Sequence, residues 1–121
     1  MGKKIMIIDD SGSLRQVVNI TLTMSGYSVT EAVNGQDAID KLQNEKVNLI
    51  ICDVNMPVMD GLTFLTEFRS IAHCKFTPVI MLTTEAEGDM REKGREAGAR
   101  AWIVKPFKPD QVLNAVSKLI T

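Results

Sequence analysis

Short apolar runs recur along this chain, and most of them stop at a residue with a reactive or metal-binding side chain. The runs span residues 5–8, 28–32, 47–52, 79–82 and 101–104, and four of them are followed by Asp9-Asp10, Asp53, Thr83 and Lys105-Pro106. Only the run at 28–32 lacks such an ending. If the runs are parallel strands, their carboxyl ends share one edge of a sheet, where ligands bind. The repetition therefore predicts one site that combines carboxylates, a hydroxyl and an ammonium group.

The segments between the runs repeat their apolar residues with a period near 3.6 residues, which predicts helices. The four clear stripes are Leu14, Val17, Val18, Leu22 and Met24; Ala38, Ile39 and Leu42; Leu62, Leu65, Phe68 and Ile71; and Val112, Leu113, Val116 and Ile120. A weaker helix is predicted over residues 86–97, where two glycines interrupt a sparse apolar side. Strands that alternate with helices predict an α/β protein, a doubly wound (βα)5 parallel sheet with helices on both faces. The half-polar run at 28–32 is expected at an edge of that sheet.

Length and composition limit the classes of protein to consider. A chain of 121 residues predicts a single domain over residues 1–121, without an output domain. A protein needs a basic surface to bind nucleic acid, so the formal net charge of −1 argues against a nucleic-acid partner. The apolar runs are too short for a membrane span or a signal peptide, so we expect no membrane partner and a cytoplasmic location. Cys52 and Cys74 have no metal-ligand spacing and are expected to be reduced thiols.

Each candidate site residue also has an ordinary structural explanation. Asp9 and Asp10 could cap the following helix, Thr83 could cap the weak fourth helix, and Lys105 could be a solvated side chain before a turn. Asp53 could be one more loop aspartate. Taken together at matched strand ends, however, the residues favour a shared site. Several carboxylates at close range repel one another unless they share a cation, and magnesium prefers such oxygen ligands.

The joint pattern resembles the receiver domains of bacterial two-component response regulators, in particular stand-alone CheY-like chemotaxis receivers. The likeness covers all 121 residues and is carried by Asp9-Asp10, the segment DVNMPVMDG at 53–61, Thr83-Thr84-Glu85, Gly98-Ala99 and Lys105-Pro106-Phe107. It implies a flavodoxin-like sheet of order 2-1-3-4-5. It also implies a sensor histidine kinase upstream, a protein target downstream such as the flagellar motor switch, and a monomer that is not an enzyme beyond its own phosphorylation and dephosphorylation.

The resemblance further implies a role for individual residues. Asp53 would accept the phosphoryl group, while Thr83 and Lys105 would contact the phosphoryl oxygens. Mg²⁺ would be bound by Asp10, by Asp53, by the backbone carbonyl of Asn55, and by Asp9 through water. The remaining assignments are a cis peptide bond at Lys105-Pro106, a switch formed by Thr83 and Trp102, and a short phosphoryl lifetime set by Asn55 and Glu85.

Two other functions stay open from the sequence. A phosphorelay intermediate, which passes its phosphoryl group to a histidine phosphotransfer protein, would use the same chemistry at Asp53. A phosphatase of the haloacid-dehalogenase type would need a second aspartate two residues after the nucleophile, where this chain has Asn55. The sequence identifies neither the kinase nor the target.

Overall fold

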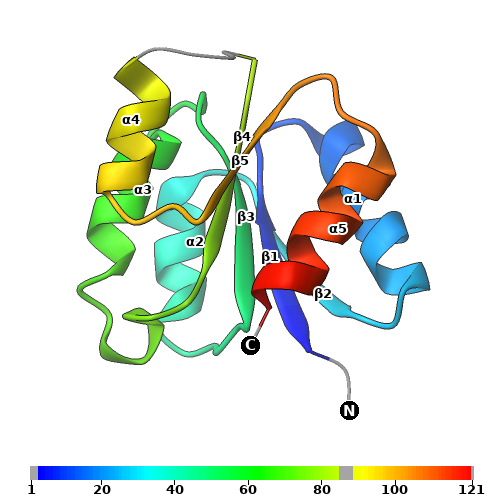
Figure 1. Cartoon of the computed structure of the whole chain (residues 1–121). Helices are drawn as coiled ribbons and strands as arrows, with labels where there is room; N and C mark the ends of the chain where they lie inside the picture. Colours follow the sequence, from blue (N-terminus) through cyan, green and yellow to red (C-terminus); the bar gives the residue numbers. More distant parts are fainter. Residues whose placement is uncertain (1–2, 85–88, 121) are drawn as a thin grey trace.

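Five parallel strands form one sheet at the centre of the molecule in the computed structural model, which describes residues 3–84 and 89–120 (Figure 1). The strands are β1 (Lys4–Ile8), β2 (Ser28–Ala32), β3 (Leu49–Asp53), β4 (Val79–Thr83) and β5 (Ala101–Val104). Their order is β2-β1-β3-β4-β5, so the predicted fold and the edge position of the second strand are confirmed.

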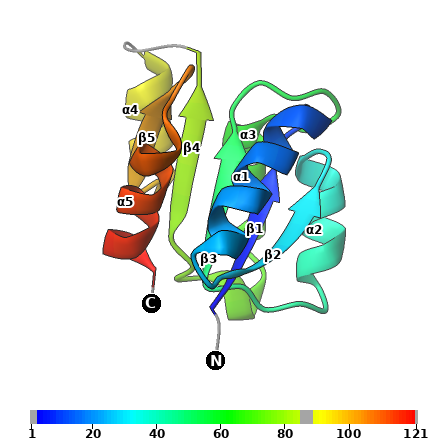
Figure 2. The ribbon, with the colours of Figure 1, turned by 90° about the vertical axis from the view of Figure 1, so that its right-hand side faces the viewer.

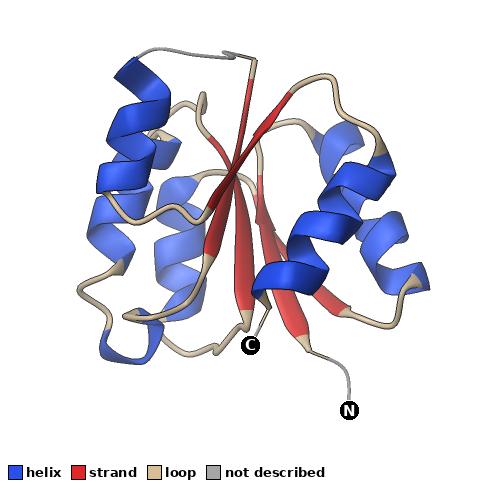
Figure 3. Cartoon of the chain, in the orientation of Figure 1, coloured by secondary structure: helices blue, strands red, loops and turns tan. Residues whose placement is uncertain are grey.

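Helices cover both faces of this sheet (Figure 3). Their bounds are α1 (Gly12–Met24), α2 (Gly35–Leu42), α3 (Gly61–Phe68), the short 3-10 helix η1 (Ala72–Cys74), α4 (Asp89–Glu96) and α5 (Pro109–Leu119). α1 and α5 lie on one face, whereas α2, α3 and α4 lie on the other (Figure 1). None of the helices in the described part of the chain has the length and apolar content needed to cross a bilayer.

The core is divided into two layers by the alternation of side chains along each strand. In β1, Ile5 and Ile7 pack in the layer beneath α1 and α5, while Met6 and Ile8 pack in the layer beneath α2 and α3. All four side chains are fully buried. A strand of this kind must be apolar on both faces, which explains why the runs in the sequence are continuous rather than alternating.

Several predicted boundaries and burial assignments were wrong. β3 begins at Leu49 rather than at Val47, because its pairing with β1 starts where Leu49 meets Ile5. Val17 is 50% exposed and Met24 is 83% exposed, so neither belongs to the buried stripe of α1. Met24 follows the buried Leu22 by two residues, which is about 200° around a helix and turns it toward solvent.

Two further differences concern the third and fourth helices. α3 ends at Phe68, so the predicted stripe extended too far when it included Ile71, which precedes η1. α4 is described from Asp89 onward, and the start of the predicted stretch, residues 86–88, lies outside the described residues.

All five strands run in the same direction, so their carboxyl ends meet at the upper edge of the sheet in Figure 2. Asp53 and Thr83 are the last residues of β3 and β4, and Asp9 follows β1 directly. Asp53 is paired in register with Leu82, the residue before Thr83. The fold thus brings the predicted site residues to one edge.

Gly61, the first residue of α3, lies directly against the backbone that carries Asp53. Its N–H donates to the Val54 carbonyl oxygen at 2.9 Å. A Cβ at this position would overlap the Asp53 carbonyl oxygen and come within 2.9 Å of Val54 Cα. Backbone atoms of a central strand cannot yield as the end of a flexible side chain can, so glycine is required here by close approach rather than by its φ angle.

We predict that Gly61→Ala lowers the free energy of unfolding by about 1–3 kcal/mol, the usual cost of forcing extra atoms into a packed site. Urea unfolding followed by circular dichroism measures this change. Gly12→Ala is the matched control, because a Cβ at Gly12 meets nothing closer than the end of the Arg15 side chain at 3.6 Å. Equal effects of the two substitutions would contradict the close-approach explanation.

Candidate functional site

The turn after β1 buries one carboxylate and exposes the next. Asp9 is fully buried, and its N–H donates to the Ala32 carbonyl oxygen at 3.2 Å, which extends the pairing of β1 with β2. Its Oδ1 accepts a hydrogen bond from the Ser11 N–H at 2.8 Å. Ser11, rather than either aspartate, caps α1 by accepting from the Leu14 N–H. Helix capping therefore does not account for Asp9 and Asp10.

Asp53 lies at the end of β3 and is 4% exposed. Its Oδ1 accepts from the Asn55 N–H at 3.4 Å, and Asn55 itself is exposed on the loop that follows. Asp60, a loop aspartate nearby, has a purely structural role, because its Oδ1 accepts from the Thr63 N–H and caps α3. Asp53 makes no such cap, which separates it from an ordinary loop aspartate.

The carboxylates of Asp9, Asp10 and Asp53 converge. One oxygen from each lies within 4.8 Å of the others, although Asp10 is exposed and the other two are buried. Hard divalent cations such as Mg²⁺ bind to one or two carboxylates and keep several waters. This cluster has two buried carboxylates and one carboxylate that faces solvent. Its oxygen donors therefore fit the coordination that Mg²⁺ prefers.

Lys105 connects the two buried carboxylates. Its Nζ is 3.3 Å from Asp9 Oδ2 and 3.2 Å from Asp53 Oδ1, and its side chain is 21% exposed. The Lys105 N–H donates to the Thr83 carbonyl oxygen at 2.6 Å, which fixes the lysine to the end of β4. The peptide bond between Lys105 and Pro106 is cis. Lys105 is therefore an inward-facing ion-pair partner, not a solvated side chain.

Thr83 is fully buried at the end of β4 and pairs in register with Val104, the residue before Lys105. It is the last residue of that strand, and the start of α4, which Thr83 was alternatively expected to cap, lies outside the described residues. The structure brings five predicted residues to one edge: Asp9, Asp10, Asp53, Thr83 and Lys105. Glu85 lies outside the described residues.

Burial dominates the electrostatics of Asp9. Removal from water raises the pKa of its carboxyl above the ordinary 3.8, and the negative charge of Asp53 raises it further. The Ser11 N–H and the Lys105 ammonium lower the pKa of Asp9, but the pKa remains raised overall. Ionised Asp9 is therefore held at a cost to folding, as expected for a group that is retained for its chemistry.

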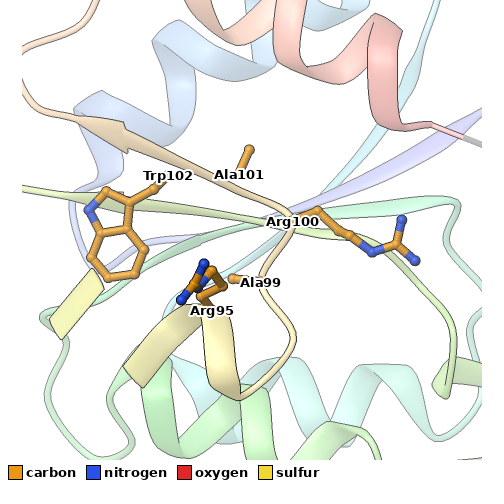
Figure 4. Close-up of a pocket in the computed structure, with 5 residues that line it drawn as sticks. All are labelled: Arg95, Ala99, Arg100, Ala101 and Trp102. Atoms are coloured by element: carbon orange, nitrogen blue, oxygen red, sulfur yellow. The ribbon is translucent and has the colours of Figure 1, made fainter. Parts of the chain in front are cut away.

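Trp102, on β5, lies apart from the carboxylates and against α4. The indole is half-buried and packs against the core layer beneath α2 and α3. A Cβ at Gly94 of α4 would overlap the indole, so that glycine makes room for the ring. Trp102 also lines a cavity of about 180 Å³ with Arg95, Ala99, Arg100 and Ala101, in which the Arg95 and Trp102 side chains lie on the same side of β5 (Figure 4).

One contact at this edge was missed by the sequence analysis. Arg15 Nη1 donates to the Asp9 carbonyl oxygen at 2.6 Å, and Arg15 Nε pairs with Glu31 at 2.9 Å. The sequence signal was an arginine in the first turns of a helix, where a positive charge is unfavourable. That signal alone does not identify the partner.

Substituting Asp9 by asparagine should stabilise the protein in the absence of metal by about 0.5–2 kcal/mol, the usual size of one stabilising substitution. The reason is that a raised pKa means the folded state resists ionisation of Asp9. The cost is present at neutral pH and fades as pH falls toward 3.8, where Asp9 is protonated. Urea unfolding of wild type and variant at a series of pH values measures the difference.

Asp60→Asn is the control for this experiment, since asparagine caps a helix as well as aspartate does. It should change stability at neutral pH by less than Asp9→Asn does, because the Asp60 side chain is exposed. A destabilised Asp9→Asn variant at neutral pH would show that the Lys105 ion pair outweighs the burial cost.

Comparison with known proteins assigns this arrangement to a family. A model described as response regulator receiver domain matches residues 5–117. The transcriptional regulatory protein ResD of Bacillus subtilis is 38% identical over 117 residues, which are 97% of this chain and 48% of ResD. The chain thus spans about half the length of the curated relatives it matches.

Two solved structures are informative neighbours. The Vibrio cholerae chemotaxis protein CheY4 superposes with a TM-score of 0.95 at 41% identity, over 99% of this chain and 100% of that chain. The receiver domain of the sensor histidine kinase PA1611 from Pseudomonas aeruginosa has a TM-score of 0.90 at 27% identity, over 98% of both chains. That structure has a magnesium ion coordinated in the active site cleft.

Proposed function

This chain belongs to the response regulator receiver family, and we propose that it is a phosphorylation-activated switch in which Asp53 accepts the phosphoryl group. The observation that carries the proposal is the Asp53 carboxylate, which lies 3.2 Å from the Lys105 ammonium inside a cluster of three acids. Membership of the family implies a histidine kinase as donor and a protein target. The chain acts on its own side chain and is not a turnover enzyme.

In the proposed reaction, an Asp53 oxygen attacks the phosphorus of a phosphohistidine. The new P–O bond forms as the P–N bond breaks, and the imidazole nitrogen that leaves takes up a proton. Lys105 already contacts the Asp53 carboxylate, so its ammonium is in reach of a phosphoryl oxygen that arrives there. The Thr83 hydroxyl, at the end of the next strand, donates to another phosphoryl oxygen. Such positioning and charge neutralisation are what phosphoryl transfer requires of a protein.

Mg²⁺ belongs to the same proposal. Asp10, Asp53 and the backbone carbonyl of Asn55 would hold it, with Asp9 acting through water. When bound, it supplies positive charge that offsets the charge of the phosphoryl oxygens. The three converging carboxylates support this assignment, and so does the magnesium ion in the related PA1611 receiver.

The signal is proposed to leave through α4, β5 and α5. Thr83 connects the phosphoryl site to β4, and Trp102 on the neighbouring strand is seated against Gly94 of α4. A shift of the indole would therefore alter how α4 packs. The likeness to CheY4, which extends over the whole of that solved chain, supports a chemotaxis target such as the flagellar motor switch.

Acetyl phosphate and magnesium should add one phosphoryl group to the wild-type protein, seen by intact-mass analysis as a single adduct. Asp53→Asn should abolish the adduct, because an amide is not a nucleophile for phosphorus at neutral pH. Removing magnesium with a chelator should slow the reaction strongly. The Lys105→Met variant should also react slowly, as it lacks the charge that faces the phosphoryl oxygens.

Decay of the adduct tests the lifetime assignment in the same experiment. Asn55 and Glu85 are proposed to flank the approach of hydrolytic water, so Asn55→Arg should slow the loss of the phosphoryl group. Asp60→Asn again serves as the control, since it changes a carboxylate outside the cluster. An adduct that persists in Asp53→Asn would place the modification on another residue and overturn the proposal.

A further inference from the structure

Arg15 of α1 contacts the backbone between the two aspartates that follow β1. We infer that Arg15 is a positioning residue: it fixes the peptide that joins Asp9 to Asp10 and thereby aims the Asp10 carboxylate at the metal position. The inference rests on the magnesium site of the proposed function. It concerns a residue that lies outside the cluster and touches neither the phosphoryl group nor the ion.

Arg15 ties three elements together through a pair of hydrogen bonds. Its Nη1 donates to the Asp9 carbonyl oxygen at 2.6 Å, and its Nε donates to Glu31 Oε1 on β2 at 2.9 Å. The other Glu31 oxygen accepts from Asn19 Nδ2 of α1 at 2.7 Å. The Arg15 side chain is 17% exposed, so these bonds are partly shielded from water. The guanidinium is thus held in one orientation by fixed partners.

The hydrogen bond to the Asp9 carbonyl constrains Asp10 because a peptide unit is planar. Fixing the carbonyl oxygen of Asp9 fixes the plane that contains Cα of both aspartates. The Asp9 side chain has its own anchors in Ser11 and Lys105. The Asp10 carboxylate, in contrast, is exposed and makes no hydrogen bond or ion pair with any residue that the structure describes. Its direction depends on the backbone that Arg15 holds.

Arg15 is not explained by the stability of its own helix. A cation in the first turns of a helix opposes the helix dipole. The ion pair with Glu31 includes a side chain that is 36% exposed, and such pairs add little to stability. The hydrogen bond from Asn19, together with the Arg15 contact, lowers the pKa of Glu31, which keeps the carboxylate ionised as a partner for the guanidinium. These contacts serve to hold Arg15 against Asp9.

A positioning role and a purely electrostatic role of Arg15 predict changes of opposite sign in the affinity for Mg²⁺. A positive charge beside a cation site repels the cation, so removing it should tighten metal binding on electrostatic grounds alone. Loss of an orienting contact should instead weaken metal binding, by about tenfold if it resembles other outer-shell contacts. The direction of the change therefore decides between the two.

The experiment measures Mg²⁺ binding by isothermal titration calorimetry for the wild-type protein, Arg15→Met and Arg15→Lys. We expect about tenfold weaker binding for Arg15→Met. Arg15→Lys should also bind more weakly, because one ammonium group cannot contact both Glu31 and the Asp9 carbonyl as the guanidinium does. The order parameter of the Asp10 amide, measured by 15N NMR relaxation without metal, should fall in both variants.

Arg95→Met is the matched control, since Arg95 also pairs with a glutamate but lies exposed on α4. This substitution should change neither the affinity for Mg²⁺ nor the NMR measurement at the Asp10 amide. Unchanged or tighter Mg²⁺ binding by Arg15→Met, with wild type binding normally, would overturn the inference. If Arg15→Met does not fold, Arg15→Lys serves by itself, because it keeps the positive charge and loses one of the two contacts, so weaker Mg²⁺ binding by this variant is again required.

A wild-type protein that binds no Mg²⁺ would instead contradict the proposed metal site. The order parameter of the Asp10 amide in the metal-free protein then decides the role of Arg15 by itself. A value that is as high in Arg15→Met as in wild type would overturn that role, whatever the metal result.

Discussion

Lys105 controls the charge balance on which this site depends. A single ammonium group lies 3.3 Å from Asp9 and 3.2 Å from Asp53, two carboxylates that are almost entirely removed from water. Burying carboxylates is costly, and one positive charge offsets only part of the cost when a third carboxylate, Asp10, lies close by. The site therefore retains net negative charge, which favours a divalent cation. In the proposed function, the same lysine would be in reach of a phosphoryl oxygen on Asp53.

The remainder of the fold provides the rigidity that such a charge cluster requires. Two apolar layers bury the strands on both faces, so the strand ends that carry Asp53 and Thr83 have little freedom to move apart. Gly61 lets α3 begin directly against the Asp53 backbone, and the Lys105 N–H is bonded to the end of β4. Stability is thus supplied by the core, while the carboxyl edge of the sheet holds groups that oppose folding.

Much of this arrangement could be predicted from the sequence, because it depends on local patterns. Continuous apolar runs indicated buried parallel strands, and the residues that end them indicated the site. Contacts between distant elements could not be predicted: nothing in the sequence shows that Arg15 reaches the Asp9 carbonyl or that Gly94 faces Trp102. The burial of Met24 in α1 was also predicted wrongly. The period of the apolar residues identifies a stripe along a helix, but it does not give the width of the face that the sheet covers. The order of strands came from the family resemblance.

The most direct test of the account is a crystal structure of the protein grown with Mn²⁺ and beryllofluoride, which stands in for the phosphoryl group. The account predicts beryllium bonded to one Asp53 oxygen, an anomalous peak for the metal between Asp10 and Asp53, and Lys105 Nζ in contact with a fluorine atom. Metal or beryllofluoride bound elsewhere, with Asp53 unmodified and still paired with Lys105, would contradict it.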